Sequence, residues 1–242
     1  MITNSTSLTG NRIIHLFRGR ASNIYIIEDH NKDSTFLIDC GMPSDTKALI
    51  TVLDPLPPLK RIVCTHFHVD HISGWISLKR YKHDCEIWFH EAARPFVMGH
   101  RRIPLPSFND YISILIPCMR DYGYIPSLRD VFTGRLYGTP FKRGFPLERV
   151  NFFTNQQTVL PEFMTIHTPG HRPDSVSFFD PNSGILVTGD FLVVIGDRLI
   201  NNTYLSNPKD QQRSISKILG LKTLRFIWPG HGPCKSFSPD LF

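Results

Sequence analysis

The sequence predicts an α/β protein, and three observations support this fold class. Short apolar runs rich in Ile, Val and Phe recur along the chain, and such runs are typical of buried strands. Between them lie segments in which apolar residues follow helical spacing. The chain has 242 residues, of which 41% are hydrophobic, and this is enough for the core of one large domain without repeats or low-complexity runs.

Eight segments are expected to form strands, because each is dominated by apolar or β-branched residues. They are Ile24–Ile27, Phe36–Ile38, Arg61–Cys64, Glu86–Phe89, Phe163–His167, Ser175–Phe179, Ile185–Thr188 and Phe226–Trp228. Three segments are expected to be helical, and the last follows the start signal Asn-Pro. They are Ser44–Leu53, Gly74–Tyr81 and Lys209–Leu219. These elements alone predict a mixed α/β arrangement without fixing its topology.

Four potential metal ligands follow the expected strand Arg61–Cys64 within a few residues. They are His66, His68, Asp70 and His71. In an extended segment, residues two apart point the same way, so the first three would share one direction, and a turn would bring in the fourth. Imidazole and carboxylate groups suit zinc and also accept iron, manganese or nickel. A solvated loop is the ordinary explanation for one histidine, but not for so tight a set.

Three further ligand candidates lie downstream, each in a turn after an apolar run. They are His171, Asp190 and His231, and a glycine directly precedes each one. Glycine lets the backbone turn sharply, so the following side chain can be presented at the edge of a sheet. Each residue taken singly would be an ordinary surface group, but together with the first cluster they indicate a metal centre.

The ordered set His-x-His-x-Asp-His, then His, Asp and His, resembles the metallo-β-lactamase-fold hydrolases, and the resemblance runs from about Asn23 to His231. It implies a four-layer αββα sandwich that forms one domain over residues 1–242, with a substrate-shaping insertion at about 94–150. It also implies a ligand set, in which one metal is held by His66, His68 and His171, the second by Asp70, His71 and His231, and Asp190 bridges the two. Asp39 matches the aspartate that orients the histidine cluster from outside the ligand shell.

The resemblance further implies two divalent metal ions, with zinc expected and manganese or iron also compatible with the ligands. A metal-bridging hydroxide would be the nucleophile, because bound metal lowers the pKa of water to about 7. Asp190, as the bridge, and Asp70 are the candidate catalytic carboxylates. Asp70 has a second role open to it as a proton shuttle, although metal coordination favours its ionised form.

The insertion at about 94–150 is rich in Pro, Gly, Arg and aromatic residues, and a connection this long is usually functional. Candidate residues for an apolar wall of the substrate pocket are Phe108, Tyr111, Phe132, Tyr137, Phe141, Phe191 and Tyr204. For the five of these that lie in the insertion, packing within the insertion is the alternative. Arginines and lysines are also concentrated there, and such a patch could steer an anionic substrate.

The leading expectation for the reaction is hydrolysis of a small-molecule carboxylic ester, lactone or thioester, as in N-acyl-homoserine lactonases and glyoxalase II-type enzymes. Two departures stand against either specific substrate. Phe191 and Leu192 follow Asp190 where lactonases have a nearby tyrosine, and Ser73-Gly74 follows the cluster where glyoxalase II enzymes have Gly-Gly. The first alternative is a phosphodiesterase or nuclease-type hydrolase with the same metals, and the second is a non-catalytic metal- or ligand-binding module.

The five cysteines are odd in number and contain no Cys-x-x-Cys pair, so neither a disulfide scaffold nor a structural zinc knuckle is indicated.

The first eleven residues are polar and lack the basic and then apolar pattern of a signal peptide. We therefore expect a cytoplasmic protein that binds a small-molecule substrate. A nucleic-acid partner is disfavoured, no membrane association is expected, and the sequence leaves the oligomeric state open.

Overall fold

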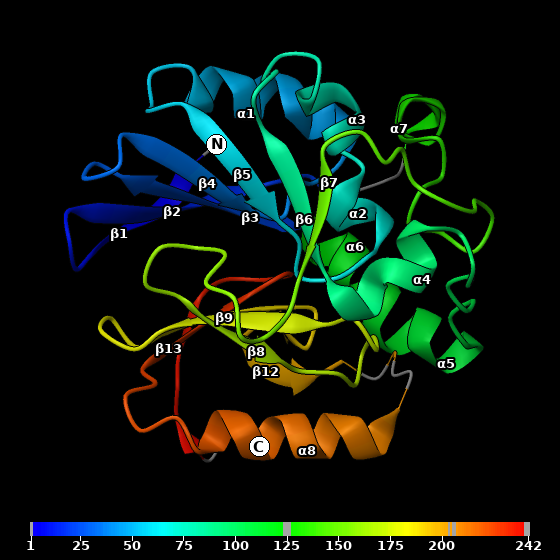
Figure 1. Ribbon diagram of the computed structural model, residues 1–242. Coiled ribbons are helices and arrows are strands. Elements are labelled where there is room, and N and C mark those ends of the chain that lie inside the picture. Colours follow the sequence, from blue (N-terminus) through cyan, green and yellow to red (C-terminus); the bar gives the residue numbers. More distant parts are fainter. Residues whose placement is uncertain (1, 123–126, 203, 205–206, 240–242) are drawn as a thin grey trace.

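Two β-sheets face each other at the centre of the structure, with helices on the outer side of each (Figure 1). The structure is a computed structural model that describes residues 2–122, 127–202, 204 and 207–239. The first sheet has seven strands whose spatial order follows the chain. They are β1 (Ile2–Leu8), β2 (Arg12–Arg18), β3 (Asn23–Asp29), β4 (Ser34–Ile38), β5 (Leu59–Val63), β6 (Glu86–His90) and β7 (Val150–Phe153).

The second sheet has five strands in the order β14-β13-β10-β9-β8. Their bounds are β8 (Met164–His167), β9 (Val176–Asp180), β10 (Ile185–Gly189), β13 (Phe226–Pro229) and β14 (Lys235–Ser236). A separate two-stranded sheet pairs β11 (Leu192–Ile195) with β12 (Arg198–Asn201).

Helices lie on both outer faces and at one end of the sandwich. The α-helices are α1 (Thr46–Leu53), α2 (Val69–Ile72), α3 (Trp75–Leu78), α4 (Arg94–Val97), α5 (Phe108–Asp110), α6 (Ile116–Tyr122), α7 (Leu128–Gly134) and α8 (Pro208–Leu219). Two short 3₁₀ turns span Pro43–Asp45 and Glu91–Ala93, and a π-helical turn spans Tyr111–Leu115.

Residue alternation in β3 explains why the core has several layers. Ile24 and Ile26 pack with α1 and α3 on one face of the sheet, whereas Tyr25 and Ile27 pack against the second sheet on the other face. A third apolar cluster joins the outer face of the second sheet to Ile218 of α8. The architecture is therefore the expected four-layer αββα sandwich.

All eight expected strands are present, and the structure adds six more. Four of the additional strands, β1, β7, β12 and β14, are short, partly polar or exposed along much of their length, so their residues lack the apolar signal of a buried strand. Within the expected helix Gly74–Tyr81, the α-helix α3 covers only Trp75–Leu78. A separate helical turn, α2, begins earlier at Val69.

Residues between β6 and β7 carry the helices α4 to α7, which gather at one end of the sandwich (Figure 1). The chain stays helical from Phe108 to Tyr122 although this stretch contains Pro117. A π-helical turn ends at Leu115, two residues before the proline, and changes the hydrogen-bond spacing near the point where the ring and its missing N–H interrupt the α pattern. In the described part of the chain, no helix is long and apolar enough to cross a bilayer.

Candidate metal centre

The candidate ligands gather at one edge of the sandwich because the strands that precede them end there. β10 and β13 are parallel. β10 ends at Gly189, directly before Asp190, and β13 ends at Pro229, two residues before His231, so Asp190 and His231 emerge side by side. The antiparallel pairing of β9 with both β8 and β10 brings the end of β8, and hence His171, to the same edge. A backbone hydrogen bond of 2.9 Å from Val176 N to Thr65 O joins this edge to the loop after β5.

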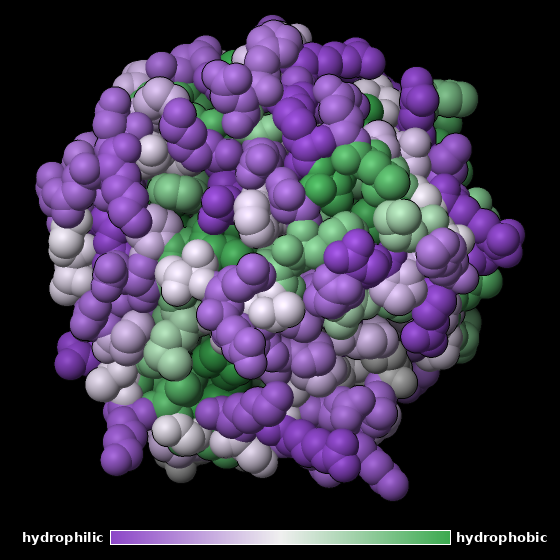
Figure 2. All heavy atoms as spheres, viewed as in Figure 1, coloured by the Kyte–Doolittle hydropathy of each residue, from purple (hydrophilic) through white to green (hydrophobic). Residues whose placement is uncertain are grey.

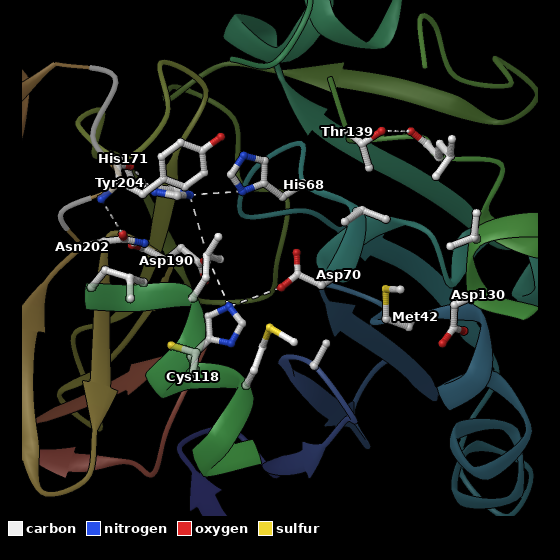
Figure 3. A pocket seen from close by; sticks show the side chains of 18 residues that line it. Met42, His68, Asp70, Cys118, Asp130, Thr139, His171, Asp190, Asn202 and Tyr204 are labelled. Atoms are coloured by element: carbon white, nitrogen blue, oxygen red, sulfur yellow. Dashed lines mark hydrogen bonds and ion pairs between the residues drawn. The ribbon is translucent and has the colours of Figure 1, made fainter. Parts of the chain in front are cut away.

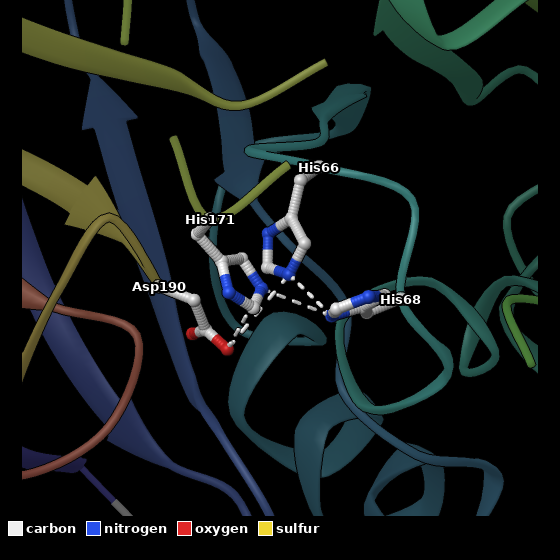
Figure 4. A group of neighbouring side chains, drawn as sticks. All are labelled: His66, His68, His171 and Asp190. Carbon is white, nitrogen blue, oxygen red and sulfur yellow. Dashed lines mark hydrogen bonds and ion pairs between the residues drawn. The ribbon is translucent and has the colours of Figure 1, made fainter. Parts of the chain in front are cut away.

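His66, His68, His171 and Asp190 form one buried group of ligand atoms (Figure 4). Nδ1 of His68 lies 3.0 Å from Nε2 of His66 and 3.2 Å from Nε2 of His171. Four ligands at the usual zinc–nitrogen distance of about 2.05 Å in a tetrahedron stand about 3.3 Å apart. The three nitrogens therefore have the spacing of ligands around one metal ion.

Hydrogen bonds made by Nδ1 of His66 and of His171 fix which nitrogen of each ring is free to bind a metal. Nδ1 of His66 donates to Thr65 Oγ1 at 3.0 Å, since this hydroxyl itself donates to Asp39. Nδ1 of His171 donates to the carbonyl oxygen of Tyr204 at 2.8 Å. Both Nε2 atoms thus turn lone pairs toward His68 Nδ1, which could donate to only one of them. A cation at this point satisfies all three nitrogens, so the residues fit a metal.

Asp70, His71 and His231 form the second group, and the carboxylate of Asp190 lies between the two groups. Nε2 of His231 is 3.3 Å from Asp70 Oδ2 and 3.2 Å from Asp190 Oδ2. Nε2 of His71 is 3.1 Å from Asp190 Oδ1, and neither of these two buried atoms has a hydrogen-bond partner among the described residues. Such orphaned atoms are expected where a metal ion is the missing partner.

The strand alternation expected for His66, His68 and Asp70 holds only in part. His66 and His68 do converge, but Asp70 lies in the first turn of α2, and the backbone is no longer extended after His68. The helical turn explains why Asp70 and His71 join His231 in the second group instead of extending the row of the first two histidines.

Asp39 contacts the site from outside the ligand groups. Its Oδ2 accepts a 2.8 Å hydrogen bond from His71 Nδ1, and its Oδ1 accepts one of 2.8 Å from the backbone N–H of Thr65. The residue has φ 62°, in the left-handed region that Asp tolerates better than most residues. The carboxylate thereby leaves Nε2 of His71 free to face the site.

Two glycines permit the close approach of the ligand loops. Gly189 has φ 52°, and an added Cβ would lie 2.5 Å from Thr65 Oγ1. At Gly230 an added Cβ would lie 2.3 Å from Asp190 Oδ1 and 3.0 Å from His71 Cε1. Only glycine fits at either position without displacing neighbouring atoms.

The two groups differ in charge in the metal-free protein. Burial lowers the pKa of His66 and His68 well below its usual value and lowers the pKa of His171 to about 4, so these rings are neutral and ready to ligate. Burial opposes the charged form of His71 and His231 as well, but Asp190 and its neighbouring carboxylates raise the pKa of both well above the usual value.

A pocket of ≈ 320 Å³ opens directly onto these ligands (Figure 3). His68, Asp70, His171, Asp190 and His231 form its floor together with Asn202 and Tyr204. Its walls are mostly apolar and come from the loops after β2 and β4, from α2 and from the insertion. They are Ala21, Met42, Val69, Ile114, Leu115, Cys118, Met119, Asp130, Val131, Leu136 and Thr139.

Of the aromatic residues predicted to form the pocket wall, Tyr204 lines this pocket, where its ring stacks on His68 at 5.7 Å between ring centres. Its hydroxyl donates to Pro104 O at 2.7 Å, which ties it to the insertion. The other aromatic residues of the prediction lie elsewhere. Phe108, Tyr111, Phe132 and Phe141 are exposed to solvent, Tyr137 packs against Phe145, and Phe191 is fully buried beneath the second sheet.

The lining of this pocket differs from the predicted wall because composition does not show which way a helical residue faces. Ile114 and Cys118, four residues apart, form the inner side of the helix that spans the insertion, whereas Phe108 and Tyr111 lie on its outer side. Ile112 and Ile116 have the same four-residue spacing but are exposed, so the spacing alone does not single out the inner pair.

Lys and Arg side chains are absent from one part of the described site, and cysteines are absent from another. No Lys or Arg is among the described residues that line the pocket. The two ligand groups found in the described chain contain no cysteine, and Cys40 and Cys64 are buried free thiols, as expected for small apolar residues. Burial raises the pKa of both thiols well above the usual value.

Comparison with known families identifies the class of protein. A profile of the Metallo-beta-lactamase superfamily matches residues 17–231, so the chain belongs to this superfamily. Together with the two His/Asp groups, this membership supports a metal-dependent hydrolase that binds divalent metal ions. The "Probable metallo-hydrolase YflN" of Bacillus subtilis (strain 168) is 26% identical over 249 residues, covering 94% of this chain and 88% of the relative.

Solved structures show the same fold. The crystal structure of BLEG-1 B3 metallo-beta-lactamase matches with a TM-score of 0.57 and 24% identity over 91% of this chain and 94% of its own. The structure of TTHA1623 in a di-iron-bound form matches with a TM-score of 0.58 and 24% identity over 89% of each chain. At this identity the likeness concerns the fold.

Proposed function

We propose that this chain is a dinuclear metal-dependent hydrolase of a small-molecule carboxylic ester, lactone or thioester that carries an apolar group. The observation that carries the proposal is the apolar pocket placed directly on two groups of metal-ligand atoms. The first metal would be held by His66, His68 and His171, the second by Asp70, His71 and His231, with Asp190 bridging them. Zinc is expected first, and iron or manganese also suit these ligands.

When bound, two divalent ions polarise a substrate carbonyl and lower the pKa of a coordinated water. The residues of the chain then supply orientation. Asp39 holds His71, and Thr65 holds His66, so each ring presents Nε2 to the site. Asp70 reaches the pocket floor with Oδ2 toward His231, and in this proposal its carboxylate would pass a proton to the leaving group.

The walls support the choice of substrate class. Apolar side chains from α6, α7 and α2 would exclude water around the substrate and bind an acyl or alkyl portion, at about 0.8 kcal/mol for each methylene buried. In this proposal residues 94–150 are the substrate-shaping insertion of a single domain. They supply Ile114, Leu115 and Val131 to the pocket.

A phosphodiester substrate fits the pocket less well. A phosphodiester keeps a negative charge in the ground state and is usually met by Arg or Lys, and the described lining residues include neither. The basic residues of the insertion lie outside the lining. A non-catalytic binding module is also disfavoured, because all seven expected ligands are brought together.

The test is hydrolysis by zinc- and manganese-loaded protein of a matched panel. The panel contains an acyl-homoserine lactone, a glutathione thioester, an aryl octanoate, a β-lactam and an aryl phosphodiester. The proposal expects turnover of one of the first three, lost on chelation and restored by metal. Preferred turnover of the phosphodiester would overturn the substrate class, and a fully metal-loaded protein inert to the whole panel would favour the binding module.

A further inference from the structure

The helical segment from Phe108 to Tyr122 has apolar residues both toward the pocket and toward solvent. On its inner side Ile114 and Cys118 are buried and line the pocket. On its outer side a stripe of large apolar residues faces solvent. The stripe consists of Phe108, Tyr111, Ile112 and Ile116, which follow the spacing of one helix face. A helix that is apolar on both sides is expected to be covered on both, and here only one side is covered by the protein.

Neighbouring parts of the insertion extend the exposed apolar surface. Phe108 is 81% exposed, and Leu128 and Phe132, one turn apart on α7, are each 76% exposed. Ten of the fourteen exposed large apolar residues found in the described chain fall between residues 98 and 147. Figure 2 shows apolar side chains among hydrophilic ones at the surface on the side where α4 to α7 lie. Concentrated exposure of this kind marks an interaction surface.

Positive charge accompanies the apolar residues. Residues 98–147 contain seven Lys or Arg against three Asp, a net charge of +4 out of +6 for the whole chain. All seven basic residues are exposed, whereas one of the three aspartates, Asp130, is buried. The insertion thus combines exposed Phe and Ile with exposed Arg and Lys, the composition by which amphipathic helices bind membrane interfaces.

We infer that the outer surface of the insertion, defined by the 108–116 stripe, Leu128 and Phe132, docks on an anionic lipid surface. A second copy of this chain is the less suitable occupant, because a symmetric contact would bring two faces of +4 together. An anionic bilayer instead satisfies both features, since its acyl region takes the apolar stripe and its headgroups attract the basic residues. This surface binding is independent of the proposed hydrolysis.

The inference departs from the expectation that no membrane is involved. In the linear sequence, Ile112 and Ile116 cannot be told apart from the buried Ile114, and only the fold shows that they face outward.

The experiment is co-sedimentation of the full chain with vesicles of phosphatidylcholine alone and of phosphatidylcholine with 30% phosphatidylglycerol. We expect binding to the anionic vesicles at 50 mM salt, weaker binding at 500 mM salt, and little binding to the neutral vesicles. The double variant I112D/I116D should lose at least about tenfold in lipid affinity, because charge enters the apolar stripe.

A matched control is available elsewhere on the surface. Met164 and Leu219 are 53% and 45% exposed, close to the 50% and 45% of Ile112 and Ile116, but they lie outside the insertion. The variant M164D/L219D should bind vesicles as the unmodified chain does. F132D on α7 provides a second test of the surface if I112D/I116D fails to fold, as judged by circular dichroism.

The inference is overturned if the unmodified chain ignores anionic vesicles at low salt, or if I112D/I116D and M164D/L219D lose affinity equally. It is also overturned if light scattering finds a dimer that I112D/I116D converts to monomer while lipid binding is absent, because the stripe then joins two copies.

Discussion

Asp39 accepts a 2.8 Å hydrogen bond from Nδ1 of His71, with both side chains almost fully buried. This bond fixes the ring so that Nε2 faces Asp190, and the same carboxylate holds the loop that carries His66 through Thr65. One residue outside the ligand groups thus orients both halves of the proposed centre.

Replacing Asp39 with Asn should weaken metal binding by about 10–100-fold, because the amide keeps the shape but loses the charge that fixes the ring of His71. Metal affinity measured by competition with a chromophoric chelator checks this. D29N is the control, since Asp29 is equally buried but accepts only backbone hydrogen bonds of a turn. Equal metal affinity of D39N and D29N would remove the orienting role from Asp39.

Gly230→Ala should fold and yet bind metal at least about tenfold more weakly, because the added Cβ would displace the carboxylate of Asp190. Gly220→Ala is the matched control. Gly220 ends α8 with φ −75°, and its nearest contact to an added Cβ is 3.3 Å. Metal content by mass spectrometry and unfolding by heat should separate the two variants, and a G230A protein with full metal content would contradict the close packing described here.

Metal binding at pH 7 should release at least about two protons for each chain, because the pKa values of His71 and His231 are raised and both rings must lose a proton to ligate, and ionisation of a coordinated water adds to this count. The direction of the pH dependence of metal binding follows from the raised pKa values of the two rings. A raised pKa keeps these rings protonated at pH 7, so metal affinity should increase with pH. Calorimetry in buffers of different ionisation enthalpy counts the protons, and a count of zero at pH 7 would refute the charge state of the second group.

Val131→Phe should reduce kcat/KM for octanoyl esters while sparing acetyl esters, because Val131 lines the apolar wall on α7. Each methylene excluded from the wall should cost about fourfold, corresponding to about 0.8 kcal/mol. A series of aryl esters from acetyl to octanoyl measures this dependence. An equal loss of kcat/KM for every ester in the series would show that the acyl group does not lie against Val131.

The gathering of the candidate ligands could be predicted from sequence because they lie in short motifs beside strand ends, where local spacing carries the information. His171, Asp190 and His231 are far apart in the chain, yet each follows a strand and a glycine, and parallel or alternating strands bring such positions to one edge. Asp70 shows the limit, since its position on α2 depends on a helical turn that alternation does not reveal.

The pocket walls could not be predicted in the same way. Whether Phe108 or Ile114 faces the metal groups depends on how the insertion packs on the sandwich, and large aromatic residues were chosen where smaller aliphatic ones form the wall. Likewise β1 was missed because most of its residues are polar and exposed at the edge of the sheet.

Titration of metal-free protein with zinc, recording bound metal and ester hydrolysis together, tests the dinuclear centre most directly. The account predicts that activity rises to a plateau at two metal ions for each chain, and that H171A and H231A each bind one and lose most of their turnover. A plateau at one metal ion, or an H231A variant that keeps two metals and full activity, would contradict it.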